Sequence, residues 1–350
     1  FSSDRNGQYD LYLARSADSK ESNLLKTLKR EVLRMTNTPQ NERAAVISPD
    51  SKKIAFKQNR GILITADISS DGKLSNQKTL LNGWAVPDDF SWSPDSKWLS
   101  YALEDLNFNS EVYIHAADNS SKAVNISMHP RGDYSPVWSK DGSKLGFVST
   151  RNNSDDDVWF VWLKKEDWEK TKQDWDDFDE EEAEDDKKKD DKETVKPIQI
   201  DFENIHQRLV QVTALPADEG SLAISDDGET FFFTTNGGGR QTFSAKADLY
   251  SIKWDGTDQK ALTTGGAEPR GVSLEPNGKQ LYMVKRGGSL AKIKTDGGKV
   301  EGVSFTAKMN INYPEERKQI FEEAWRTLNM GFYDPQFHGQ DWTKLKAKYK

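Results

Sequence analysis

The sequence predicts an all-β protein, a β-propeller with a short C-terminal α-helical segment, and three observations lead to this prediction. A ten-residue unit recurs along the chain, its copies are spaced as four-stranded blades require, and helical periodicity is confined to residues 312–350. Hydrophobic residues make up 35% of the chain, and Gly and Pro together number 36 of 350 residues. Many short strands joined by tight turns have such a composition.

The repeated unit joins a Ser-x-Asp turn to a strand that ends in an aromatic residue. Clear copies occupy residues 47–56, 92–101 and 138–147, and weaker copies start at Ile224 and Leu274. The turn acid, or the Asn that replaces it, stands at positions 50, 95, 141, 227 and 277, so the intervals are 45, 46, 86 and 50 residues. The longest interval contains a charged segment of 31 residues (164–194), and 55 residues remain without it. This spacing favours one four-stranded blade per repeat.

Further signatures predict the remaining strands of each blade. Asp-Ser, Asp-Gly and Asn-Gly pairs between short apolar runs indicate hairpin turns, because Gly, Asn and Asp tolerate positive φ. The third strand opens with an acidic, an aliphatic and an aromatic residue, and the fourth often ends in Thr or Ser. The third-strand signatures are Asp10-Leu11-Tyr12, Glu111-Val112-Tyr113, Asp157-Val158-Trp159 and Asp248-Leu249-Tyr250.

The number of blades is less closely determined. Residues 1–6 match residues 147–152, so we expect the chain to start inside a blade, and six repeats are visible. A closed propeller with six or seven blades fits this count. We favour seven, because residues 300–311 contain an additional strand-like run. The alternative fold is an antiparallel β-sandwich with regular turns, which has no reason to repeat the turn unit.

The charged segment 164–194 holds 16 acidic and 8 basic residues and thus accounts for the whole net charge of −8. With few apolar residues it cannot offset the entropy of ordering, so we predict a disordered, mobile surface loop. It contains no Gly, which argues against a calcium loop. The rest of the chain is balanced in charge and has no basic stripe for nucleic acid.

The pattern changes after Asn312. Pro314 suits a first helical turn, apolar residues then recur every three or four positions up to Leu328, and Asp341 is placed to cap a second helix. We therefore predict an N-terminally truncated propeller over residues 1–311 and the start of a helical domain over 312–350.

The junction between these parts carries a resemblance to a known family. Its motifs are Phe321-Glu322-Glu323-Ala324-Trp325-Arg326, Phe332-Tyr333-Asp334-Pro335, His338-Gly339 and Asp341-Trp342. They resemble the start of the core domain of tricorn-type proteases, and the Ser-Pro-Asp turns resemble TolB-like propellers. The resemblance implies a large serine endopeptidase of propellers, core and PDZ-like domain, in which the propeller gates or docks peptides. It places the catalytic residues beyond Lys350.

No residue of this chain matches a catalytic motif, so we predict no catalytic, cofactor-binding or metal-binding residue here. The four histidines, His115, His129, His206 and His338, are scattered and form no zinc pattern. His338 is interpreted as a turn residue and not as a base. The run 237–239 of three glycines is interpreted as a hairpin loop and not as a phosphate cradle, because it links two strands.

Aromatic residues form the last group of candidates. We interpret Trp98, Tyr113, Trp159, Trp162 and Tyr250 as packing between blades, and a carbohydrate or peptide groove is the alternative.

The resemblance also implies partners and location. We expect peptide or oligopeptide substrates and a homo-oligomer formed through domains outside this chain. We expect a cytoplasmic location, or a periplasmic one if a signal peptide precedes Phe1. There is no cysteine and no apolar run of about 20 residues that predicts a membrane span. The competing functions are a TolB-like interaction scaffold and the propeller cap of a prolyl-oligopeptidase-type hydrolase.

Overall fold

The structure, a computed structural model, describes residues 1–152, 155–171, 173–175, 197–237, 246–306 and 309–350. Within these ranges the chain forms six antiparallel sheets whose strands are hydrogen-bonded in sequence order. The first sheet has three strands, β1 (Ser2–Ser3), β2 (Asp10–Ser16) and β3 (Arg30–Arg34).

Each of the other five sheets has four strands. The second comprises β4 (Glu42–Ile47), β5 (Lys53–Gln58), β6 (Ile62–Ile68) and β7 (Leu74–Asn82). The third comprises β8 (Asp88–Trp92), β9 (Trp98–Glu104), β10 (Ser110–Ala116) and β11 (Val124–Asn125). The fourth comprises β12 (Asp133–Trp138), β13 (Lys144–Ser149), β14 (Asp157–Trp162) and β15 (Leu209–Gln211). The fifth comprises β16 (Glu219–Ile224), β17 (Thr230–Thr235), β18 (Asp248–Lys253) and β19 (Lys260–Ala261), and the sixth β20 (Arg270–Leu274), β21 (Gln280–Val284), β22 (Leu290–Lys294) and β23 (Glu301–Gly302).

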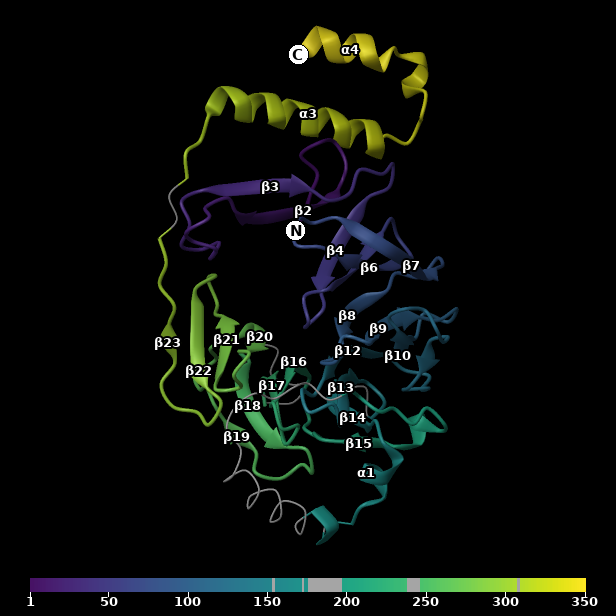
Figure 1. Cartoon of the computed structure of the whole chain (residues 1–350), viewed down its shortest axis with the longest axis vertical. Helices are drawn as coiled ribbons and strands as arrows, with labels where there is room; N and C mark the ends of the chain where they lie inside the picture. Colours follow the sequence, from purple (N-terminus) through teal and green to yellow (C-terminus); the bar gives the residue numbers. More distant parts are fainter. Residues whose placement is uncertain (153–154, 172, 176–196, 238–245, 307–308) are drawn as a thin grey trace.

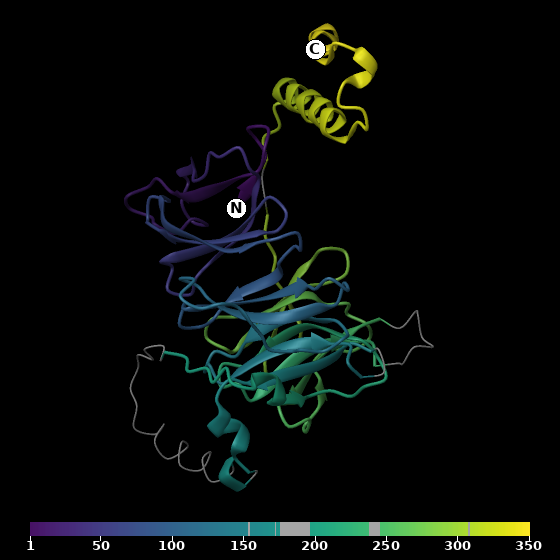
Figure 2. The same cartoon turned by 90° about the vertical axis from the view of Figure 1, so that its right-hand side faces the viewer.

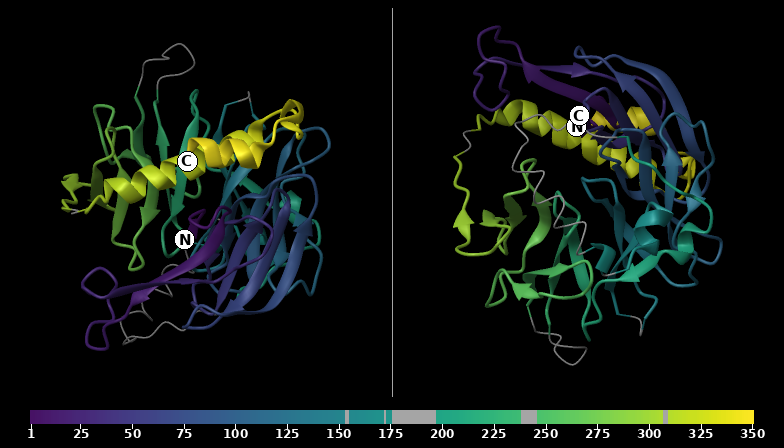
Figure 3. Two further views of the ribbon diagram at one scale, coloured as in Figure 1. Left: turned by 90° about the horizontal axis from the view of Figure 1, so that it is seen from above. Right: turned by 60° about the horizontal axis from the view of Figure 1, so that its bottom comes forward.

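The sheets follow one another around a common axis as the blades of a propeller (Figures 1 and 3). The first strand of each four-stranded sheet is the innermost, and β4 packs on β8, β8 on β12, β12 on β16, and β16 on β20. The predicted β-propeller is therefore confirmed, and the β-sandwich alternative is wrong.

The described residues form six blades, so our preference for seven is wrong. The described residues of the strand-like run 300–311 do not start a further sheet. Its residues Glu301–Gly302 form β23, which pairs with β22 as the outermost strand of the sixth blade. The run completes a blade because the hairpin after Lys294 brings Glu301 opposite Lys292, whose Nζ lies 3.5 Å from its carboxylate.

The repeated turn joins the first and second strands of each four-stranded blade. Its serine is the central residue: the Oγ of Ser48 accepts a hydrogen bond from the backbone N–H of Lys53 and donates to Asp50. Ser93, Ser139 and Ser225 accept the equivalent N–H, at 2.8–2.9 Å. The residue after the anchor position has positive φ in all five turns, namely Ser51, Ser96, Gly142, Gly228 and Gly278. The predicted turn chemistry is thus confirmed.

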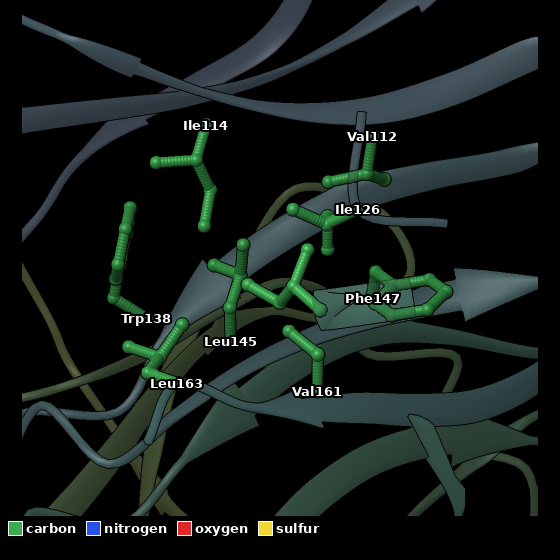
Figure 4. Packing of buried hydrophobic residues seen from close by; sticks show 9 residues of the cluster. Val112, Ile114, Ile126, Trp138, Leu145, Phe147, Val161 and Leu163 are labelled. Atoms are coloured by element: carbon green, nitrogen blue, oxygen red, sulfur yellow. The ribbon is translucent and has the colours of Figure 1, made fainter. Parts of the chain in front are cut away.

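The hydrophobic core is divided into clusters that lie between neighbouring blades. Figure 4 shows one such cluster, in which Val112 and Ile114 of the third blade meet Leu145, Phe147 and other residues of the fourth. Because the fourth sheet is buried on both faces, its middle strands β13 and β14 are nearly continuous apolar runs, whereas β21 and β22 of the sixth blade alternate between buried and more exposed residues.

The predicted match between residues 1–6 and residues 147–152 is reproduced in three dimensions. Arg5 Nε donates to Ser3 Oγ at 3.2 Å, and Arg151 Nε donates to Ser149 Oγ at 2.8 Å. The Arg5 guanidinium lies 4.6 Å from the ring centre of Tyr12, in the same way as Arg151 lies 4.8 Å from that of Trp159. β1 and β2 therefore correspond to the second and third strands of a full blade.

The predicted loop 164–194 starts with a helix that sequence reasoning missed. α1 (Lys165–Glu169) follows β14, and Trp175 then stacks on Trp162 of the fourth blade with ring centres 5.1 Å apart. Burial of an indole against the blade stabilises this start, which the polar composition alone did not indicate. Residues 176–194 lie outside the described residues, so their predicted disorder stays a prediction.

Two helices follow the sixth blade and lie at one end of the molecule (Figure 2), where Arg326 of the first helix pairs with Asp4 at 2.8 Å. α3 (Tyr313–Gly331) is capped by Asn312 and α4 (Trp342–Tyr349) by Asp341, whose side chains accept from backbone N–H groups. Trp325 stacks on Trp342 with ring centres 4.3 Å apart, so the predicted apolar stripe faces the second helix. The boundary at 311/312 stays a prediction. No helix in the described part of the chain is long and apolar enough to cross a membrane.

Candidate functional site

The innermost strands β4, β8, β12, β16 and β20 all contain a β-bulge near their start. One extra residue interrupts the pairing with the second strand of each blade. A residue in the left-handed region lies at each bulge, namely Ala44, Asp89, Ser135, Ser221 and Gly271, with φ between 49° and 57°. Each stands six residues before a turn anchor, so the small side chains at this fixed spacing were a signal that sequence reasoning missed.

These bulges connect neighbouring blades. Ser135 Oγ of the fourth blade donates to Asp89 Oδ2 of the third at 3.0 Å, and Trp92 Nε1 donates to the Val46 carbonyl of the second at 3.1 Å. An extra residue turns backbone and side-chain groups out of the ladder, which makes them available for such contacts. The bulges therefore help to hold the innermost strands at a fixed separation.

The exposed side chains of the innermost strands are chemically mixed. Val46 and Ile47 are exposed on β4, Asp88 and Asp89 on β8, and Arg270 on β20. The exposed residues of β4, β8 and β20 are thus apolar, acidic and basic, Arg43 of β4 being a second exposed basic residue, while β12 and β16 have no exposed residue.

A second repeated contact explains the Thr or Ser signature after the fourth strand and, for Glu111 and Asp248, the acid signature of the third strand. A hydroxyl just after the fourth strand accepts the backbone N–H of the residue that follows the acid of the third strand, at 2.8–3.0 Å. The pairs are Thr36 with Leu11, Ser127 with Val112, Thr213 with Val158, and Thr263 with Leu249. Each hydroxyl also donates to a carboxylate, that of Glu42, Glu111, Glu219 or Asp248. These acids therefore satisfy buried polar groups.

Two of the carboxylates at this end of the blades are buried close together. Glu219 starts β16 and Asp157 starts β14, and each is 3% exposed. Glu219 Oε2 accepts from Thr213 at 2.8 Å, but Glu219 Oε1 and Asp157 Oδ1 have no hydrogen-bond partner among the described residues. Burial, opposed by the Thr213 hydrogen bond and reinforced by the Asp157 charge, raises the pKa of Glu219 to about 8. Burial also raises the pKa of Asp157 to about 6.

The neighbouring carboxylate Asp133 differs because a cation accompanies it. Arg151 Nη2 lies 3.0 Å from Asp133 Oδ1, and both side chains are largely buried. No group of three or more His, Cys, Asp or Glu residues is arranged to hold a metal ion in the ranges that the structure describes. The buried acids are thus positioned as partners of hydroxyl, amide and guanidinium groups.

The structure separates the four histidines. His115 is buried in β10, where its ring contacts the Tyr101 hydroxyl at 3.2 Å, and burial lowers the pKa of its imidazole. His129 follows β11 and His206 lies in the 3-10 turn η2 (Ile205–Gln207). His338 lies in the turn η3 (Phe337–Gly339), with its Nε2 2.5 Å from the Tyr333 hydroxyl, which confirms it as a turn residue. The absence of catalytic residues from this chain stays a prediction.

The predicted aromatic residues pack as expected. Trp162 is buried, while Trp98, Tyr113, Trp159 and Tyr250 are half-buried against the clusters between blades. The packing interpretation is therefore confirmed.

The glycine run is flanked as predicted. It lies between β17 and β18, which pair as a hairpin, so it does link two strands. Residues 238–245 themselves lie outside the described residues.

Lys144 is a buried cation that sequence reasoning missed. Its side chain is 1% exposed, and its Nζ lies 4.3 Å from the ring centre of Trp162 and 3.7 Å from Glu229 Oε1. Burial lowers the pKa of this amine, and the acidic groups around it oppose the shift. The aromatic faces and the carboxylate together replace part of its hydration.

Two hollows lie away from the innermost strands. One of about 440 Å³ is lined by Thr263, Gly265, Gly266, Lys285 and Arg286, between the fifth and sixth blades. The other, of about 280 Å³, lies among the repeated turns and is lined by Pro49, Asp95 and Pro197 together with neighbouring turn residues. Neither brings together a nucleophile and a base.

Known proteins share both parts of this architecture. Residues 313–350, which form α3, η3 and α4, match the model of the Tricorn protease C1 domain. The Tricorn-like protease C-terminal subunit of Sulfurisphaera tokodaii is 23% identical over 323 residues, which cover 87% of this chain and 35% of that relative. The resemblance to tricorn-type proteases is confirmed.

Solved structures show the same fold. The crystal structure of the tricorn protease superposes with a TM-score of 0.67 at 13% identity and covers 91% of this chain and 32% of that one. The TolB protein of Agrobacterium tumefaciens superposes with a TM-score of 0.53 at 14% identity, covering 78% of this chain and 83% of its own. The chain spans about a third of the length of the tricorn-type relatives.

Proposed function

We propose that this chain is the propeller portion of a tricorn-type serine protease that degrades peptides, and that the propeller gates or docks the substrate. The observation that carries the proposal is the order of parts: a propeller is followed, after Gly302, by a helical segment that matches the Tricorn protease C1 domain. We assign the catalytic serine and its partners to residues outside this chain.

The innermost strands support the docking role. Exposed side chains of mixed character lie on β4, β8 and β20, and contacts such as Ser135 to Asp89 link adjacent blades. Peptides of differing sequence need varied, weakly specific contacts, which a mixed surface provides.

The gating role is tested by narrowing the propeller from within. In the complete protease, Ser273→Trp places an indole at an exposed position of β20. We expect kcat/KM for a twenty-residue peptide to fall about tenfold and that for a fluorogenic tetrapeptide to stay unchanged, because only the longer chain needs passage or docking. The matched control, Lys78→Trp on the outermost strand β7, is expected to change neither. Equal effects on both substrates would refute gating.

A second experiment tests where catalysis occurs. The purified 350-residue chain is expected to show no turnover of a fluorogenic peptide, while the complete protein turns it over and loses activity with a serine-directed inhibitor. Inhibitor-sensitive turnover by the 350-residue chain itself would overturn the assignment of catalysis to other residues.

The competing function is a TolB-like interaction scaffold, and the fold similarity to TolB favours it. A scaffold has no need of the segment 313–350 that matches the C1 domain. A complete protein without peptidase activity that co-purifies with a protein partner would favour the scaffold.

Assembly and location complete the proposal. We propose a homo-oligomer formed through domains outside this chain and a cytoplasmic location, with the periplasm as the alternative. Analytical ultracentrifugation of the complete protein and cell fractionation test the two statements separately.

A further inference from the structure

Three exposed apolar side chains lie on two adjacent loops at one end of the propeller. Trp84 is 45% exposed between β7 and β8, and Leu106 and Phe108 are 82% and 74% exposed between β9 and β10. The rings of Trp84 and Phe108 meet edge to face with centres 6.0 Å apart. We call these three residues the loop patch. Their solvation is costly, so an exposed aromatic pair of this kind marks an interaction surface.

The loop that carries Trp84 is held rigidly. Arg60 Nε donates to the Trp84 carbonyl at 3.2 Å, and the Gly83 N–H donates to the Gly61 carbonyl at 3.1 Å. A Cβ at Gly61 would lie 2.0 Å from the Gly83 oxygen, so only glycine allows this approach. The indole is therefore presented by a fixed backbone.

The loop that carries Phe108 is also rigid, and it is strained. Asp105 Oδ1 accepts from the N–H groups of Asn107 at 2.7 Å and Asn109 at 3.0 Å, and this turn holds Phe108 at φ 61°. A bulky residue in the left-handed region is a genuine outlier, and burial of the ring does not compensate for it, because the ring is exposed. Because burial of the ring does not offset this backbone strain, the strain indicates that the Phe108 ring is positioned to contact a binding partner.

The surroundings of the loop patch are acidic. Glu104 and Asp105 precede Leu106 and make no ion pair within the part of the chain that the structure describes. Hydrogen bonds from the backbone of Asn109 hold the pKa of Asp105 below its usual range, so this group is charged at neutral pH. Lys57 of β5 is paired with Asp88 at 3.0 Å, and Arg60 is the cation that contacts the backbone of Trp84. The loop patch is therefore apolar, with the acidic Glu104 and Asp105 beside Leu106 in the sequence and the basic Arg60 on the side of Trp84.

From this we infer that the loop patch binds an extended peptide segment in which an aromatic or aliphatic residue is flanked by basic residues. The apolar side chain packs on the Trp84–Phe108 pair and the basic ones lie against Glu104 and Asp105. The inference rests on the proposed role of the propeller in docking peptides and names the class of peptide it selects.

The test measures binding of fluorescein-labelled peptides to the complete protein by anisotropy, with mass spectrometry of the same sample to verify that they stay intact. We expect Gly-Lys-Phe-Leu-Lys-Gly to bind at least tenfold more tightly than Gly-Glu-Phe-Leu-Glu-Gly or Gly-Lys-Ser-Ser-Lys-Gly. Equal affinities for the three peptides would overturn the inference.

Variants locate the binding. Phe108→Gly removes the ring and suits the positive φ, so the fold is retained, and Trp84→Ser removes the second ring. Each substitution is expected to weaken binding of Gly-Lys-Phe-Leu-Lys-Gly about tenfold, and Glu104→Gln is expected to weaken it severalfold. The matched control is Leu28→Ser, which removes another exposed apolar side chain, 96% exposed between β2 and β3, and is expected to change nothing. Unchanged affinity in Phe108→Gly and Trp84→Ser would overturn the inference.

Two outcomes distinguish peptide binding at the loop patch from self-association and from gating. If the wild type self-associates in sedimentation and Phe108→Gly does not, the occupant is a second copy and the peptide assignment is overturned. If the basic-apolar peptide binds through the loop patch while Ser273→Trp leaves long-peptide cleavage unchanged, the loop patch stands and the gating role fails. If Ser273→Trp lowers cleavage of the long peptide but the basic-apolar peptide does not bind through the loop patch, the gating role stands and the loop-patch inference fails.

Discussion

Replacing Glu219 by Gln is expected to remove most of a pH-dependent loss of stability that this carboxylate imposes on the propeller. Glu219 is 3% exposed between the fourth and fifth blades, and its pKa of about 8 compares with an ordinary value of 4.5. In the unfolded chain Glu219 is ionised above pH 5, whereas in the folded protein it stays protonated until about pH 8. The folded state therefore binds more protons over this range, and stability falls as the pH rises.

The magnitude follows from the pKa difference. Each pKa unit corresponds to about 1.4 kcal/mol, so the shift from 4.5 to about 8 amounts to on the order of 4–5 kcal/mol lost between pH 4.5 and pH 8. Asp157, with a pKa of about 6, contributes in the same direction between pH 4 and pH 6. Gln keeps an oxygen that accepts from Thr213 and carries no charge. The free energy of unfolding of the Glu219→Gln variant is expected to equal that of wild type near pH 5 and to exceed it by several kcal/mol near pH 9.

The assay is urea unfolding followed by circular dichroism at pH 5, 7 and 9. Glu203→Gln serves as control, because Glu203 is exposed and its variant should keep the wild-type pH dependence. If Glu219→Gln has the same fall in unfolding free energy between pH 5 and pH 9 as wild type, Glu219 is ionised in the folded protein and the reasoning is refuted.

Three further predictions concern stability and are measured by urea unfolding at pH 7. Lys144→Met is expected to leave the free energy of unfolding unchanged or raise it by up to about 2 kcal/mol, since it removes a buried cation, whereas a fall of more than 1 kcal/mol would contradict this. Ser51→Gly should raise the free energy of unfolding by about 1 kcal/mol, because φ is 60° at this residue. Ser96→Gly should not raise it, because Ser96 Oγ accepts a hydrogen bond from the Asp50 N–H. Equal effects of the two substitutions would contradict this reasoning. Gly146→Ala should lower the free energy of unfolding by about 1–3 kcal/mol, because the new Cβ would lie 2.9 Å from a methyl of Ile224. An unchanged free energy would show that Ile224 of the fifth blade moves away without cost.

The agreement between sequence and structure is best where the determining contacts are local. Ser48 binds the N–H five residues on and Asp50 two residues on, so a single decapeptide carries all the groups of its turn. The acid and Thr signatures join residues of one blade or of two consecutive blades, and they recur with each repeat. Capping of the last two helices by Asn312 and Asp341 is local as well, and it was predicted.

The site was harder to predict, because its contacts join distant residues. Ser135 and Asp89 lie 46 positions apart, and nothing in either repeat indicates that the bulges meet across blades. The start of segment 164–194 was predicted to be disordered from its charge, yet Trp175 finds a partner in Trp162, which only the stacked arrangement brings near.

The sequence by itself determined that the chain repeats a four-stranded meander and then turns helical, because turn residues, helical periodicity and caps act within a few positions of the backbone. Only the tertiary structure decided that there are six blades, that Glu219 and Asp157 share a buried space, and that Trp84 meets Phe108 in solvent. Those features depend on desolvation and on distances between separate loops, and neither quantity exists until the blades have packed around their axis.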